Sequence, residues 1–206
     1  MIYLVIISAV LALSFAAFNF TTVKRMPEGT EKMSEIAAAI RVGANAFINY
    51  EYKILYTVVT IVAVLLAIVT TWHAAVALII GSVMSGCAGF VGMKIATYAN
   101  VRVANRARET KDIGKTVKVA FQGGSVMGLC VGGFALLGLF LVYLIFGMAM
   151  GQLQITDASY VNMLGLNFCP FTMTLSGYAL GCSLVAMFNR VGGGIYTKAA
   201  DMGADL

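Results

Sequence analysis

The sequence predicts an all-α membrane protein, a polytopic bundle of five transmembrane helices within one membrane domain over residues 1–206. Hydrophobic residues make up 60% of the chain and charged residues only 11%, whereas a soluble domain carries about 25% charged residues. Five apolar stretches are also near the length of about 20 residues that a helix needs to cross the hydrocarbon core of a bilayer. Lipid is therefore the expected solvent for much of this chain.

The first expected span covers residues 2–20 and resembles a secretory signal in its apolar character. A signal peptide has its positive charge before the apolar run, whereas Lys24 and Arg25 follow this one. No A-x-A cleavage pattern follows it either. We expect a retained helix with its N-terminus outside.

The other four expected spans cover residues 54–71, 74–98, 119–147 and 161–189. Trp72 and His73 alone separate the second span from the third, which predicts a tight helical hairpin. Pro170 lies inside the fifth and is expected to kink it, because neighbouring helices in a membrane can satisfy the carbonyl that proline frees.

The positive charges predict the orientation of the bundle. With the N-terminus outside, residues 21–53, residues 99–118 and the tail from residue 190 face the cytoplasm. Together with Lys94, near the cytoplasmic end of the third span, these segments hold all 14 Lys and Arg residues. The positive-inside rule therefore places the C-terminus in the cytoplasm. Charge that sorts by membrane side also argues for a lipid bilayer and against a nucleic-acid partner.

Residues 27–53 have apolar residues at helical spacing after Pro27 and Glu28. Two alternatives remain open for this segment, a helix lying on the membrane surface or a partly inserted, re-entrant segment. Glycines at steps of four residues, Gly124, Gly128 and Gly132 in the fourth span and Gly177 and Gly181 in the fifth, predict close helix packing in a larger assembly.

The end of the chain carries the residues best suited to chemistry. If the fifth helix continues past the membrane, Lys198, Asp201 and Asp205 share one face. Paired carboxylates suit Mg²⁺, which also binds substrate phosphates, and a lysine one turn away can hold phosphate oxygens. The alternative is a solvated helix face. Arg190, at the membrane boundary, is either a positive anchor or a charge on an ion path.

Two long segments, Arg190 to Asp201 continued by Gly203 to Leu206, and Gly89 to Arg102, resemble the membrane-bound, ion-pumping inorganic pyrophosphatases. Residues 40–47 and 124–128 add weaker similarity, and the order matches along essentially the whole chain.

The resemblance implies a homodimer that hydrolyses cytoplasmic pyrophosphate with Mg²⁺, with K⁺ as a possible activator, and moves H⁺ or Na⁺ outward. It also implies that Lys198 contacts pyrophosphate, that Asp201 and Asp205 belong to the magnesium site, and that Arg190 lies at the entrance of the ion path. No residue of this chain is assigned a catalytic role. A prokaryotic plasma membrane is the expected location.

The chain reaches Leu206 directly after the first acidic motif of that family, and the later acidic motifs do not occur in it. We therefore expect the N-terminal portion of a pump, which binds magnesium pyrophosphate weakly and does not turn it over alone. A secondary transporter or channel component that uses Arg190 and Lys94, or a structural membrane subunit, remains the alternative. The sequence does not decide between H⁺ and Na⁺.

Overall fold

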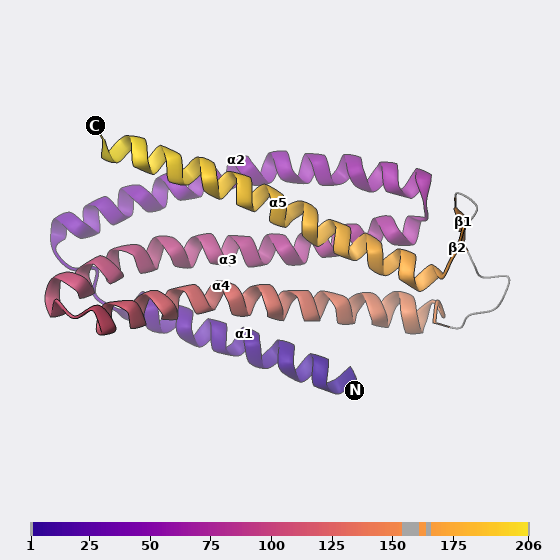
Figure 1. The fold of residues 1–206 in the computed structure, drawn as a ribbon, viewed down its shortest axis with the longest axis horizontal. Helices are drawn as coiled ribbons and strands as arrows, with labels where there is room; N and C mark the ends of the chain where they lie inside the picture. Colours follow the sequence, from indigo (N-terminus) through magenta and orange to yellow (C-terminus); the bar gives the residue numbers. More distant parts are fainter. Residues whose placement is uncertain (1, 154–160, 164–165, 206) are drawn as a thin grey trace. The chain divides into compact units, whose positions relative to one another are not determined.

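Five long helices dominate the computed structural model, which describes residues 2–153, 161–163 and 166–205 (Figure 1). The helices are α1 (Ile2–Arg25), α2 (Glu31–Val69), α3 (Trp72–Thr110), α4 (Ile113–Val142) and α5 (Pro170–Ala204). Each contains a stretch long and apolar enough to cross a membrane. The predicted helical fold and its five candidate spans are therefore confirmed within the described residues, and the direction of each crossing stays a prediction.

The backbone contacts divide the chain into two compact units. Unit 1 contains Met1–Ile6, Tyr52–Gly86 and Ala135–Leu206, and unit 2 contains Ile7–Glu51 and Cys87–Phe134. Helices α2, α3 and α4 pass without a break from one unit into the other. All of α5 belongs to unit 1, and most of α1 belongs to unit 2.

Helix α2 corrects the expectation for residues 27–53. Residues 31–53 form no separate surface or re-entrant element, because a single 39-residue helix runs from Glu31 to Val69 and includes the second span. It contains no proline and a single glycine, Gly43, so nothing in its sequence interrupts helical hydrogen bonding. At 1.5 Å per residue, α2 is about 58 Å long and exceeds the hydrocarbon core of about 30 Å.

The connections between α1, α2, α3 and α4 are short and have local causes. Gly29 turns the chain between α1 and α2 with φ of +101°, a conformation that suits glycine. The predicted hairpin between the second and third spans is present, although Thr70 and Thr71 make the turn and Trp72 already begins α3. Asp112 caps α4 by accepting the N–H of Gly114 at 2.8 Å.

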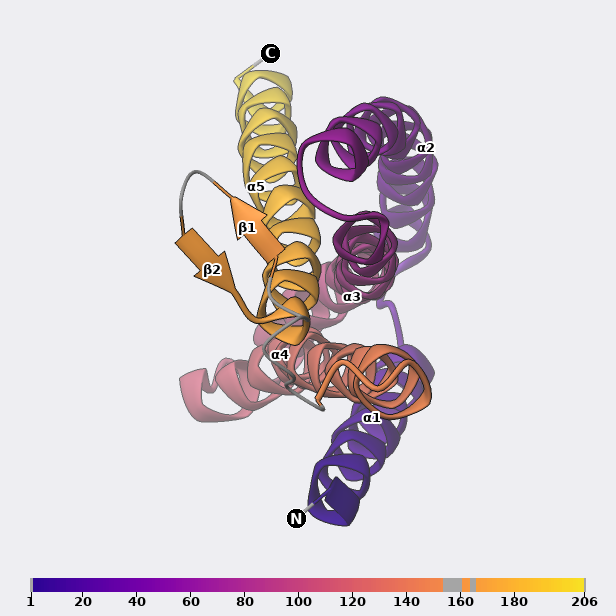
Figure 2. The ribbon, with the colours of Figure 1, turned by 90° about the vertical axis from the view of Figure 1, so that its right-hand side faces the viewer.

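The fifth span differs from its prediction at its start. Residues 161–163 (β1) and 166–168 (β2) form an antiparallel two-stranded sheet in which Val161 pairs with Phe168 (Figure 2). Pro170 is the first residue of α5 rather than a kink within it. Proline fits there because it has no N–H to donate and the first turn of a helix needs none from it. The fourth span also changes, since α4 begins at Ile113 and continues into a π-helix, η1 (Tyr143–Ala149).

The core of unit 1 depends on close contact between α5 and α3. A Cβ atom at Gly177 or Gly181 would collide with the carbonyl oxygen of Ala74 or Leu78, respectively. These glycines therefore let the two backbones touch, as the sequence predicts for the fifth span. Beside them, Leu55 and Val185 are fully buried in an apolar cluster with Leu78.

The core of unit 2 lies among α1, α3 and α4. Its buried residues are mostly small or β-branched, namely Ala16, Val23, Ala88, Ile95, Ala99, Val126 and Cys130. In the part of α4 that belongs to unit 2, Gly123 and Gly133 contact other helices, through Ala99 and Leu13. A Cβ at Gly124, Gly128 or Gly132 would meet nothing within 4 Å in the part of the chain described, so no helix of this chain packs there, and packing against a larger assembly stays a prediction.

Candidate functional site

The residues predicted at the end of the chain lie on the last turns of α5. The three glycines at 192–194 do not interrupt this helix, which continues to Ala204. Asp205 follows with φ of −83° and ψ of −12°, and its N–H donates to the carbonyl of Asp201 at 3.1 Å. Lys198, Asp201 and Asp205 therefore follow one another at helical spacing, as the sequence predicts.

These side chains are held loosely. Lys198 Nζ lies 3.6 Å from Asp201 Oδ2, and the two side chains are 82% and 59% exposed. An ion pair this exposed contributes about 0–1 kcal/mol to stability. Asp205 is also exposed. The face is therefore available to a ligand, and the fold does not depend on it.

Magnesium fits this face in part. The described residues contain no group of three or more His, Cys, Asp or Glu side chains able to hold a metal ion. Asp201 and Asp205 supply two carboxylates, and protein-bound Mg²⁺ is often held by one or two carboxylates together with water and phosphate oxygens. The two aspartates thus suit one side of a magnesium phosphate site, whose other ligands come from elsewhere.

Arg190 is exposed and lies eight residues before Lys198 on the same helix. Eight residues of α-helix span about 12 Å. The structure therefore does not bring Arg190 into the acidic face, and its role at an ion path stays a prediction.

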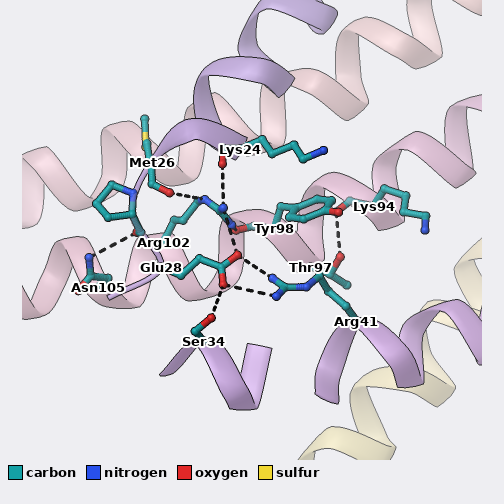
Figure 3. Close-up of polar contacts among 11 residues, drawn as sticks. Lys24, Met26, Glu28, Ser34, Arg41, Lys94, Thr97, Tyr98, Arg102 and Asn105 are labelled. Carbon is teal, nitrogen blue, oxygen red and sulfur yellow. Dashed lines mark hydrogen bonds and ion pairs between the residues drawn. The ribbon is translucent and has the colours of Figure 1, made fainter. Parts of the chain in front are cut away.

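A second charged constellation lies in unit 2, and the sequence analysis missed it (Figure 3). We call it the arginine cluster, and it consists of Glu28, Ser34, Arg41, Tyr98 and Arg102. Arg41 Nη1 donates to Glu28 Oε1 at 2.8 Å, and Arg102 Nη2 lies 3.1 Å from the same oxygen. The hydroxyl of Ser34 donates to Glu28 Oε2 at 3.0 Å.

Arg102 also closes the C-terminal end of α1. Its guanidinium donates to the carbonyls of Lys24 and Met26 at 2.8 and 2.9 Å, and to the carbonyl of Tyr98 in its own helix at 2.8 Å. The last carbonyls of a helix lack partners within the helix and carry partial negative charge. A single side chain, only 5% exposed, thus joins α3 to the α1–α2 corner.

The ring of Tyr98 faces three cations. The Nζ atom of Lys24 and the guanidinium carbons of Arg41 and Arg102 lie 5.4, 5.5 and 5.6 Å from its centroid. Cations at this distance from an aromatic face are attracted to its quadrupole. Phe20 of α1 packs edge-on against the same ring, with the centroids 6.1 Å apart.

The cluster keeps Glu28 ionised. The hydrogen bond from Arg41 is the largest influence and lowers the pKa of the Glu28 carboxyl below its ordinary value. Partial burial opposes this shift, while Ser34 and the charge of Arg102 lower the pKa further. Both carboxylate oxygens of Glu28 are therefore hydrogen-bonded within the arginine cluster, which suits a structural role at the α1–α2 corner.

Lys94, the remaining charge singled out in the sequence, links α3 to α2. Its Nζ donates to Asn45 Oδ1 at 2.5 Å and lies 5.3 Å from the centroid of the Phe90 ring. The side chain is accessible, and its role on an ion path stays a prediction.

Comparison with known proteins shows the family to which this sequence is similar. A family model described as inorganic H⁺ pyrophosphatase matches residues 10–206. A "K(+)-stimulated pyrophosphate-energized sodium pump" of Thermotoga maritima is 64% identical over 195 residues, which is 95% of this chain and 27% of that protein. A "K(+)-insensitive pyrophosphate-energized proton pump 2" of Moorella thermoacetica is 41% identical over 198 residues, 96% of this chain and 26% of the relative.

A proton pump of the K(+)-insensitive kind from Methanosarcina mazei is 36% identical over 202 residues, 97% of this chain and 26% of that relative. The chain thus spans about a quarter of the length of the curated relatives that it matches. The predicted resemblance is confirmed, because the family match covers nearly every residue. This chain belongs to the inorganic H⁺ pyrophosphatase family.

Proposed function

We propose that this chain is part of a pyrophosphate-energised ion pump and contributes one side of its magnesium pyrophosphate site. The observation that carries the proposal is the exposed face of Lys198, Asp201 and Asp205 at the end of α5, in a chain of the pyrophosphatase family. Lys198 binds pyrophosphate oxygens as a point charge. Asp201 and Asp205 ligate Mg²⁺, which when bound neutralises phosphate charge and orients the attacking water.

The length of α5 supports a site at the membrane surface. From Pro170 to Arg190 the helix rises about 30 Å, which is enough to cross a hydrocarbon core. Lys198 lies about 12 Å further along, where its charge is solvated. The positive-inside rule favours the cytoplasmic side for this end and the outside for the N-terminus.

We further propose that the transported ion is Na⁺ and that K⁺ stimulates the pump. The support is the 64% identity to a relative with that description, against 41% and 36% for two relatives described as proton pumps. Arg190 then lies at the entrance of the ion path. The pump is a homodimer in a prokaryotic plasma membrane.

The 206 residues by themselves bind magnesium pyrophosphate weakly and do not hydrolyse it. Two carboxylates leave much of the coordination shell of a magnesium ion to other ligands. Measurable Mg²⁺-dependent pyrophosphate hydrolysis by the purified chain would contradict this part of the proposal.

The experiment that tests the site replaces the matching segment of the Thermotoga maritima pump with these residues. Inverted membrane vesicles then report pyrophosphate hydrolysis and Na⁺ uptake. In the active chimera, Asp201→Asn and Asp205→Asn are each expected to lower hydrolysis about 100-fold or more, because a metal ligand supplies several kcal/mol of charge stabilisation.

Glu35→Gln is the matched control, because Glu35 is also an exposed carboxylate on a long helix but lies in α2. We expect its hydrolysis to stay within about twofold of the parent chimera, as surface substitutions usually have small effects. Normal hydrolysis in both aspartate variants would remove them from the site. Na⁺ transport that persists without pyrophosphate would instead favour a secondary transporter, and a chimera indifferent to all these changes would favour a structural subunit.

A further inference from the structure

Unit 2 contains two cavities that share α4, one against α3 and the residues just after α1, the other against α1. The first, which we call the head cavity, has a volume of about 500 Å³ and opens where α1 ends and α4 begins. The second, the apolar groove, has a volume of about 400 Å³ and runs between α1 and α4 with Val91 of α3 at its side. Neither contains any of the residues proposed to bind pyrophosphate.

The head cavity is basic. Its lining includes four cations and one carboxylate, namely Arg102, Arg106, Lys115, Lys118 and Glu109. Glu28 balances the charge of Arg102, and Asp112 lies 3.6 Å from Lys115. Two cations, Arg106 and Lys118, are therefore balanced only by the carboxylate of Glu109, which leaves a surplus of positive charge. Both cations are exposed and can contact a ligand.

The arginine cluster makes this cavity rigid. Arg102 is fixed by the carbonyls of Lys24 and Met26, and the side-chain amide of Asn105 donates to the carbonyl of Pro27 at 3.4 Å (Figure 3). Asn105 is only 2% exposed. A wall held by buried hydrogen bonds loses little freedom when a ligand binds, which favours binding.

The apolar groove has the opposite character. Its lining comes mainly from α1 and α4, with Leu13, Ala17 and Phe20 on one side and Val126, Cys130 and Phe134 on the other. Thr21 is the lining residue with an oxygen in its side chain. Such a surface suits a hydrocarbon chain and offers almost nothing to a polar ligand.

The order of the two cavities along the helices defines the shape of their ligand. Gln122 lines the head cavity and Val126 lines the groove, one turn further along α4. Thr21 of α1 lines the groove, and Met26, just after the end of α1, lines the head cavity. One helical turn is about 5.4 Å, so the basic pocket and the apolar groove lie about one turn apart along α4.

We propose that unit 2 binds one anionic phospholipid, with its phosphate in the head cavity and an acyl chain in the apolar groove. Basic pockets between transmembrane helices recognise anionic headgroups in this way. A free phosphate would leave the apolar groove unfilled. A zwitterionic lipid has no net charge, so the cations of the head cavity attract it less. Both cavities are thus explained by one amphipathic ligand.

The test titrates the purified 206-residue chain with phosphatidylglycerol, with phosphatidylcholine of the same acyl chains, and with inorganic phosphate, followed by native mass spectrometry. We expect one phosphatidylglycerol to bind at least about tenfold more tightly than phosphatidylcholine. Each Lys or Arg near an anionic headgroup raises the affinity about fivefold. The preference should shrink at high salt. Equal affinity for both lipids would overturn the proposal.

Arg106→Gln combined with Lys118→Gln tests the head cavity. The double variant is expected to bind phosphatidylglycerol about 30-fold more weakly. Arg25→Gln with Lys32→Gln is the matched control, because it also removes one Arg and one Lys, but from exposed positions outside the cavity. It should change the lipid affinity less than about threefold. If the double variant fails to fold, Lys118→Gln alone should give about a fivefold loss. Unchanged affinity in the folded variant would refute the headgroup contact.

Ala17→Phe tests the groove, because Ala17 lines it and a phenyl ring there fills space that the acyl chain needs. We expect about tenfold weaker lipid binding, whereas Ala38→Phe, on the exposed side of α2, should leave it unchanged. Inorganic phosphate that competes as tightly as the lipid would show a site for free phosphate instead. A change in oligomeric state with unchanged lipid binding would assign the groove to a second copy of the chain. Either result would overturn the proposal.

Discussion

The two charged sites of this chain use similar side chains for different purposes. In the arginine cluster, Arg102 is 5% exposed and has its guanidinium bonded to a carboxylate and three carbonyls. At the end of α5, Lys198 is 82% exposed and its contact with Asp201 is 3.6 Å long. Burial with hydrogen bonds and an ion pair to these four partners makes the first site part of the fold, while exposure leaves the second free for a ligand.

The comparison explains why the charges at the end of α5, which stand out in the sequence, do not stabilise the fold, whereas those of the arginine cluster do. A charge that is removed from water must be paired, and loss of its partner is costly. An exposed pair is screened by water and holds its side chains weakly. Substitutions in the two sites should therefore change different measured quantities, namely stability in the cluster and ligand binding on α5.

The largest expected effect is on the fold, from Arg102→Met. This change leaves Glu28 with one fewer partner and frees the carbonyls at the end of α1, so we expect a loss of about 3–5 kcal/mol in the free energy of unfolding. Unfolding in mixed detergent micelles, followed by circular dichroism, measures it. Arg25→Met is the control, since Arg25 is exposed. Equal stability of the two variants would contradict a structural role for the cluster.

A smaller effect compares the two ion pairs directly by double-mutant cycles. Glu28→Gln with Arg41→Gln should give a coupling of about 1–2 kcal/mol in unfolding free energy, because the 2.8 Å contact is partly buried. Lys198→Gln with Asp201→Asn should give less than about 0.5 kcal/mol. Similar coupling energies in the two cycles would show that the two ion pairs contribute equally to stability, contrary to this expectation.

The smallest expected effect is a dependence on acid. The pKa of Glu28 is lower in the folded chain than its ordinary value of 4.5, chiefly through Arg41. Its ionised form therefore stabilises the fold fully above the ordinary pKa, and this contribution is lost as the pH falls through the lowered folded-state pKa. Melting temperatures between pH 7 and pH 3 should fall less in Glu28→Gln than in the parent. Parallel curves would argue against this linkage.

Hydropathy predicts spans better than it predicts helices. The five candidate spans are present, yet α2 and α4 begin well before the apolar stretches that revealed them. Lys53 and Lys118 come directly before these apolar stretches and lie inside α2 and α4, because lysine is a good helix former outside the membrane. The start of the fifth expected span shows a different error. Its apolar character predicts a helix, but residues 161–163 and 166–168 form two short strands.

The sequence by itself determined the class of protein, the distribution of charge and the local geometry of the α5 face. These depend on composition and on spacings within one helix, which are fixed by 1.5 Å of rise and 3.6 residues per turn. The family was also recognisable from motifs that are continuous in the chain.

Only the tertiary structure decided which faces meet. Glu28 and Arg102 are separated by 74 positions, and no spacing rule connects them. Gly181 and Gly128 belong to similar glycine rows, yet a Cβ at Gly181 would collide with the backbone of α3, whereas a Cβ at Gly128 would meet no other part of the described chain within 4 Å. The reason is physical: a helix fixes the angle between its own side chains, but its rotation toward a neighbour is set by packing among all the helices at once.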